Sequence, residues 1–141
     1  SARLADSAVD LVISNVPFGN YRVSDNRNRP YSRASIHNWF VGRALDLLRP
    51  GCLLCFITSS NFLDENDAEM RAHAASVAEL VTAFRLPKGT FERLASTSVQ
   101  ADMIILRKRA DQSADASTTW LGLGYVPDSL RHPRCRERRN G

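Results

Sequence analysis

The chain has few cysteines, and this scarcity already excludes one class of protein. Three cysteines in 141 residues cannot form the disulfide framework that holds small secreted domains together. Cys52 and Cys55 have the spacing of a metal or redox pair, but they lie in a strand-like run, where residues three apart point to opposite faces of a sheet. We therefore expect two buried thiols in a reducing, cytoplasmic compartment, and neither a zinc site nor a redox site.

Long apolar segments are also missing. The longest purely apolar run, residues 52–57, has six residues, whereas a membrane-spanning helix needs about 20. The first residues contain no charged-then-apolar signal segment. The sequence therefore predicts no membrane partner.

The chain has little net charge outside its last residues. The formal charge is +4, from 19 Lys and Arg against 15 Asp and Glu. Residues 126–141 contain five arginines and two acidic residues, so this tail supplies +3 of the excess. Charge alone is thus weak evidence for a nucleic-acid partner, although a basic excess usually suggests one.

What the chain does contain is an alternating series of strand-like and helix-like segments. We expect strands at 9–13, 53–58, 80–86 and 101–107, and helices at 36–48 and 64–76. Strands separated by single helices imply right-handed crossovers and a mainly parallel sheet. The last strand follows a loop, so we expect it to enter antiparallel at the edge. Residues 1–109 would form the folded unit, and 110–141 a linker followed by a basic, disordered tail.

The end of the first strand carries residues suited to chemistry. Ligands bind at the carboxyl ends of the strands in open parallel sheets, and the first strand is followed there by Asn15, Val16, Pro17 and Phe18. Asn15 offers an amide oxygen, Pro17 biases Val16 toward an extended conformation that can aim its carbonyl outward, and Phe18 offers a flat face. Two acceptors beside an aromatic ring suit a planar ring that bears an amino group. A strand that merely ends in a proline turn would give the same letters.

The surrounding sequence resembles a known family. Residues 10–19, DLVISNVPFG, resemble the catalytic motif of N6-adenine DNA methyltransferases, Asp/Asn-Pro-Pro-Tyr/Phe, with Val16 in place of the first proline. Further matches follow in the family's order: LLRPG at 47–51, LLCFITSSNFL at 53–63, FRLPKGTF at 84–91 and VQADMIIL at 99–106. Over roughly residues 6–109 the series is similar to the second half of the methylase domain of type I modification subunits and of large plasmid or phage methylases.

This resemblance implies a fold and a reaction. The fold would be a partial Rossmann-like, class I S-adenosylmethionine-dependent methyltransferase fold that lacks its first strands. The reaction would be methyl transfer from S-adenosylmethionine to N6 of an adenine flipped out of DNA. Asn15 and the Val16 carbonyl would hold the amino group, and Phe18 would stack on the base. Pro17 fixes its own φ, but the segment is less rigid than one with two prolines.

Basic residues near this motif are candidate DNA contacts. In the loop after the first strand these are Arg22, Arg27, Arg29 and Arg33. In the turn at 86–90, Lys88 and the polar Thr90 are candidates to line the substrate pocket and contact the DNA. A solvated loop kept soluble by its charge explains the arginines equally well, and a plain tight turn explains Lys88 and Thr90.

The family's main cofactor motif has no counterpart in the sequence. Methyltransferases of this fold bind S-adenosylmethionine through a Gly-rich turn after the first strand and an acidic residue after the second. We therefore expect the C-terminal half of a methylase domain, with the cofactor bound through a missing N-terminal half. The open sheet edge would favour marginal stability or self-association. Expected partners are DNA and either that half or a specificity or helicase subunit.

Two alternatives remain open. A nucleic-acid-binding or assembly module could keep the fold without transferring a methyl group. Within the enzyme class, the acceptor could be an RNA base or a glutamine amide, although residues 86–91 favour DNA.

Overall fold

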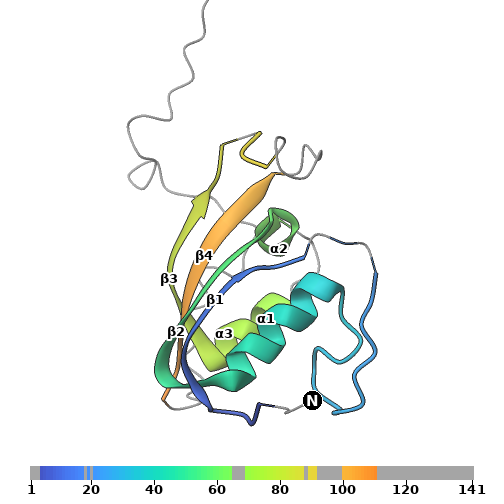
Figure 1. Cartoon of the computed structure of the whole chain (residues 1–141), viewed down its shortest axis with the longest axis vertical. Helices are drawn as coiled ribbons and strands as arrows, with labels where there is room; N and C mark the ends of the chain where they lie inside the picture. The colour runs from blue at the N-terminus through green and yellow to red at the C-terminus, as the bar shows by residue number, and fades with distance from the viewer. Residues whose placement is uncertain are drawn as a thin grey trace, which may run out of the picture.

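The computed structural model describes residues 4–17, 19, 21–64, 69–87, 89–91 and 100–110. Four strands form one sheet, and the two longer helices cover the same face of it (Figure 1). The elements are β1 (Val9–Asn15), α1 (Ile36–Leu47), β2 (Leu48–Ser59), α2 (Asn61–Asp64), α3 (Glu69–Val77), β3 (Ala78–Arg85) and β4 (Ala101–Lys108). None of the helices in this part of the chain is long and apolar enough to cross a membrane. The expected linker and basic tail at 111–141 lie outside the described residues.

The strand order is β1-β2-β4-β3. β1 and β2 are parallel, and β4 is antiparallel to both β2 and β3. The expected antiparallel strand is confirmed, but its expected place at the edge is wrong. β4 is apolar on both faces, with Ile104 and Leu106 fully buried and Met103 and Ile105 half-buried. An interior position removes these side chains from water, whereas an edge position would expose part of them.

Several element boundaries also differ from the sequence-based expectation. α1 ends at Leu47, and β2 begins at the next residue, so residues 49–51 open a strand and do not form a separate turn. Gly51 has a φ of +81°, a backbone conformation that residues other than glycine rarely adopt. In the same part of the sheet, the register of β1 against β2 shifts between Val9 and Leu11. The single helix expected at 64–76 is described as α2 and α3, with residues 65–68 outside the described residues. Cys52 and Cys55 are half-buried free thiols.

The core lies between the sheet and the two helices. Leu54 and Phe56 of β2 and Ile104 of β4 pack against α1 and α3, where Leu45 and Ala74 are buried. Each large apolar side chain buried here contributes roughly 1.5–3 kcal/mol to stability. One face of the sheet is thereby fixed against the helices.

The opposite face of the sheet is open at β1. Leu11 and Ile13 alternate with the half-buried Val12 and Ser14 and are 53% and 74% exposed, and Phe84 of β3 is 54% exposed. Parallel sheets normally have both faces covered, so this apolar face is a candidate contact surface. β1 is also an edge strand, as expected for a sheet that is open on that side.

Candidate active site at the carboxyl edge of the sheet

The predicted catalytic segment lies at the carboxyl end of β1, where the sequence places it. Asn15 is the last residue of β1 and pairs in register with Ile57 of β2. The Val16 N–H donates to the Ile57 carbonyl at 2.9 Å, and the Val16 side chain is only 3% exposed. The main chain at Val16 is therefore anchored on both sides, by a ladder hydrogen bond and by the core.

The Asn15 side chain is exposed and available. Because side chains alternate along a strand, it shares the open face of the sheet with Ile13, while Val16 enters the core. Within the described residues its amide has no hydrogen-bond partner. Pro17 is exposed beside it, and Phe18 lies outside the described residues. The site thus presents one unengaged amide acceptor on a fixed backbone.

A buried ion pair lies at the same edge of the sheet. Asp102 of β4 is 1% exposed, and its two carboxylate oxygens accept from Nε and Nη2 of Arg85 on β3 at 2.9 and 3.1 Å. Asp102 pairs in register with Thr58 of β2. The strand β2 lies between Asp102 on β4 and Asn15 on β1. Sequence reasoning missed this pair, although an aspartate inside an apolar strand is a signal for a buried partner.

The ion pair leads into the turn that contains Thr90. The Leu86 N–H donates to the Ala101 carbonyl at 2.9 Å, which ties the end of β3 to β4. Thr90 closes the turn, since its N–H and its hydroxyl both donate to the Pro87 carbonyl, at 3.2 and 2.6 Å. These bonds make Thr90 part of a tight turn. Lys88 lies outside the described residues.

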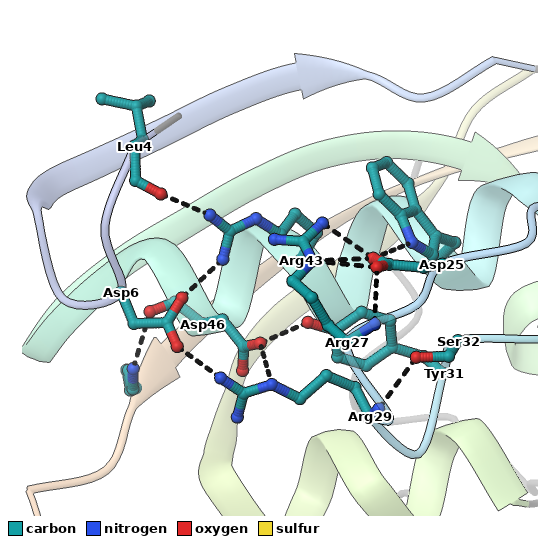
Figure 2. Close-up of polar contacts among 11 residues, drawn as sticks. Leu4, Asp6, Asp25, Arg27, Arg29, Tyr31, Ser32, Arg43 and Asp46 are labelled. Carbon is teal, nitrogen blue, oxygen red and sulfur yellow. Dashed lines mark hydrogen bonds and ion pairs between the residues drawn. The ribbon is translucent and has the colours of Figure 1, made fainter. Parts of the chain in front are cut away.

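Two of the four loop arginines are held by carboxylates. Figure 2 shows Arg27 folded onto Asp25, with Nε–Oδ1 and Nη2–Oδ2 distances of 2.9 and 2.7 Å. Arg29 reaches Asp6 at 2.6 Å, and Arg43 of α1 meets the other oxygen of that carboxylate at 2.6 Å. These two loop guanidinium groups therefore help to fasten the loop between β1 and α1.

The same network anchors the loop to α1. The Trp39 indole N–H donates to Asp25 at 3.0 Å, and the Tyr31 hydroxyl donates to Asp46 near the end of α1. Hydrogen bonds from Arg27 hold the pKa of Asp25 well below its usual range, and those from Arg43 lower the pKa of Asp6. Burial, aided by the bond to Asp46, raises the pKa of Tyr31. At neutral pH both carboxylates are therefore charged and the phenol is neutral.

The other two loop arginines face a hollow. It has a volume of about 590 Å³ and lies between the loop, α1 and α3, with Arg22 and Arg33 in its wall. His73 of α3 also lines it, with its ring centroid 5.9 Å from that of Tyr31. Burial lowers the pKa of His73, so its imidazole is neutral at pH 7.

Comparison with known proteins identifies the family. The sequence matches the Eco57I restriction-modification methylase family over residues 4–83. The chain belongs to this methylase family. The match contains β1, Asn15, the loop, α1, β2 and α3, so it includes the segment assigned above to chemistry.

Individual relatives agree with this family. The chain is 31% identical over 112 residues to the defense against restriction protein B of Escherichia phage P1, which covers 78% of this chain but 5% of the phage protein. Among solved structures, a modification subunit assigned to a type I restriction enzyme of Vibrio vulnificus has 18% identity and a TM-score of 0.61, with 74% of this chain and 23% of that chain covered. A Listeria monocytogenes protein assigned to the class I S-adenosylmethionine-dependent methyltransferases has 22% identity and a TM-score of 0.60, with 81% and 35% covered.

These structures confirm the expected fold, part of the class I S-adenosylmethionine-dependent methyltransferase fold. The chain spans between one twentieth and about a third of the length of these family relatives and structural neighbours.

The residues that the structure describes do not form a cradle for the cofactor of such methylases. Gly51 and Gly89 are the described glycines with positive φ; Gly51 lies inside β2, and Gly89 lies in the turn after β3. Neither begins a helix, so the described ranges contain no Gly-rich strand–turn–helix unit of the kind that binds a nucleotide-like cofactor.

Proposed function

We propose that this chain is the substrate-binding half of an adenine-specific DNA methyltransferase. One observation carries the proposal: Asn15 presents an exposed amide, without a hydrogen-bond partner among the described residues, at the carboxyl end of β1, beside a Val16 main chain that is anchored to β2 and to the core. Family membership supports methyl transfer as the reaction class. The amide supports an amino-group acceptor, because an amide oxygen accepts hydrogen bonds from N–H donors.

The chain's own residues would bind and orient the acceptor. The Asn15 oxygen and the Val16 carbonyl would each accept one hydrogen of the adenine amino group, which leaves the nitrogen lone pair free. Phe18 would stack on the flipped base, and Pro17 would limit the motion of the turn. The contact at Val16 uses the main chain, so the family's proline is not needed for it.

S-adenosylmethionine would supply the methyl group, and we propose that a complementary half of the methylase domain holds it. That half would pair with the open edge of β1 and cover Leu11 and Ile13. An apolar groove of about 380 Å³ between β1 and α1, lined in part by Val12 and Phe40, continues this surface around the strand. Apolar surface on both sides of one edge strand fits a partner that contributes both a strand and packed side chains. DNA would be the macromolecular substrate.

The proposal is tested by methyl transfer in a reconstituted domain. The chain is fused to, or co-expressed with, the cofactor-binding half of a methylase of this family, and incorporation of labelled methyl groups into unmethylated genomic DNA is measured. We expect Asn15→Leu to lose at least about 100-fold in rate, because positioning and hydrogen bonding of the acceptor fail together. Asn15→Asp, which the family pattern allows, should retain part of the activity. Asn26→Ala, an exposed loop asparagine, is the matched control and should change nothing.

Two results would contradict the proposal. Equal incorporation by the parent protein and Asn15→Leu would remove Asn15 from the site. No incorporation by a reconstituted domain that binds S-adenosylmethionine would favour the non-catalytic module.

A further inference from the structure

Arg22 and Arg33 differ from the other exposed arginines of the described part of the chain. Five of those exposed arginines pair with a carboxylate: Arg27, Arg29, Arg49, Arg85 and Arg107. Arg22 and Arg33 have no such partner within the described residues. A guanidinium with five donors and no paired carboxylate is suited to an external anion.

The two unpaired arginines share one site. Both line the hollow of about 590 Å³ between the loop, α1 and α3, a volume within the range of roughly 300–1,000 Å³ typical of ligand sites. Tyr21 also lines it and is 58% exposed. An exposed aromatic ring beside arginines is a combination that nucleic-acid-binding surfaces use, because the ring can stack on a base.

Backbone bonds and a ring contact link one rim of this hollow to the residue that follows the motif. The Ile36 N–H donates to the Tyr21 carbonyl at 3.0 Å, and Arg22 forms a β-bridge with Ser35 directly before α1. A Cβ added at Gly19 would lie 2.6 Å from the Tyr21 ring, so this ring packs against the residue that follows the motif. The rim that carries Tyr21 and Arg22 is therefore joined to the segment at Asn15.

The charges that face the hollow leave a local positive excess. Arg29 lines it but is neutralised by Asp6, and His73 is uncharged at neutral pH. Glu69 of α3 is the acidic residue in its described wall, against Arg22 and Arg33.

We propose that Arg22 and Arg33 bind the backbone phosphates of the DNA that enters the active site, and that one DNA strand lies in the hollow. The choice of DNA follows from the proposed function, whereas the choice of these two arginines follows from the lack of a paired carboxylate among the residues that the structure describes. Arg27 and Arg29 are assigned to the fold and not to DNA.

The test is the salt dependence of DNA binding by the 141-residue chain. Fluorescence anisotropy with a labelled duplex, at KCl concentrations between 50 and 200 mM, gives the slope of log Kobs against log salt. Each phosphate contact contributes about 0.9 to that slope, so Arg22→Ala/Arg33→Ala should lower it by about 1.8. Across this fourfold range, the parent chain should therefore lose about 12-fold more affinity than the double variant.

A matched pair removes the same charge elsewhere. Arg49 and Arg107 are equally exposed but bonded to Asp10 and Glu79 near the opposite edge of the sheet. Arg49→Ala/Arg107→Ala should leave the slope unchanged, and Arg22→Lys/Arg33→Lys should restore it. The proposal is overturned if both alanine pairs reduce the salt-dependence slope equally, or if the parent chain shows no measurable duplex binding.

Its failure is distinct from failure of the proposed function. A smaller salt-dependence slope in Arg22→Ala/Arg33→Ala, together with no methyl transfer by any reconstituted domain, would support the phosphate site and contradict the proposed enzymatic function. Asn15-dependent methyl transfer with an unchanged slope would do the reverse. A single-stranded oligonucleotide of the same sequence, run in parallel, shows whether the hollow prefers duplex or unpaired DNA.

Discussion

Gly42 in the middle of α1 allows Tyr31 to pack the loop onto the helix. A Cβ added at Gly42 would lie 2.8 Å from the Tyr31 Cε1 and closer still to two other ring atoms. The ring is 1% exposed and its hydroxyl is bonded to Asp46, so it has little room to move. Gly42→Ala should therefore destabilise the fold, even though alanine is favoured in a helix interior by about 1 kcal/mol.

The expected change in the free energy of unfolding for Gly42→Ala is the sum of two destabilising contributions and one stabilising contribution. Overpacking a filled site costs about 1–3 kcal/mol, and displacing the Tyr31 hydroxyl from the Asp46 carboxylate adds roughly 1.5–3 kcal/mol where that bond is lost. Subtracting the gain in helix propensity leaves a net destabilisation of about 3 kcal/mol. For a domain of this size that corresponds to a fall in Tm of roughly 10 °C.

Urea unfolding followed by circular dichroism measures this change, and the Tyr31→Ala background provides the control. With the ring removed, alanine at position 42 no longer meets an obstacle, and Gly42→Ala should stabilise the chain by about 0.5–1 kcal/mol. The reasoning is refuted if Gly42→Ala stabilises the parent chain, or if it destabilises both backgrounds equally.

Three further perturbations test other parts of the structure. Burial lowers the pKa of His73 in the folded chain, so the unfolded chain takes up a proton at a higher pH than the folded chain does. The contribution of His73 to the free energy of unfolding should therefore be constant above about pH 6.5 and should fall as the pH drops below that value. In thermal melts at pH 7.5 and 5.5, His73→Gln should reduce this fall. Arg85→Met should lower the free energy of unfolding by about 2–3 kcal/mol, because this variant leaves the buried Asp102 carboxylate without its cation. Asp102→Asn should have a smaller effect, and equal effects of the two variants in urea titrations would contradict this explanation. Ile13→Lys should change stability by no more than about 0.5 kcal/mol and reduce self-association in sedimentation velocity, since Ile13 is 74% exposed; a collapse of the fold would show that its side chain is needed for folding.

The order of strands and helices was predictable because each element has a strong local pattern. β1 begins with a β-branched apolar run, and α1 has apolar residues at helical spacing. The position of β4 was not predictable from its connection, since a loop can lead to an edge or back into the sheet. Its two-sided apolar pattern, with Ile104 fully buried on one face and Ile105 half-buried on the other, carried that information.

The candidate site shows the same division between local and long-range signals. Asn15 lies at the carboxyl end of a parallel strand, as the apolar run and the turn residues after it predicted. The pairing of Arg29 with Asp6 joins residues 23 positions apart, so no local pattern could separate it from the unpaired Arg33. The composition showed that the loop is basic. Only the tertiary structure distinguishes the loop arginines that pair with carboxylates from those that have no such partner within the described residues.

The nature of the methylated product tests the central claim most directly. DNA incubated with the reconstituted domain and S-adenosylmethionine is digested to nucleosides and analysed by mass spectrometry, beside a digest of the protein fraction. We expect N6-methyladenine in the DNA, in an amount that depends on Asn15. N5-methylglutamine in the protein fraction, methylated RNA alone, or N6-methyladenine at the same level with Asn15→Leu would contradict it.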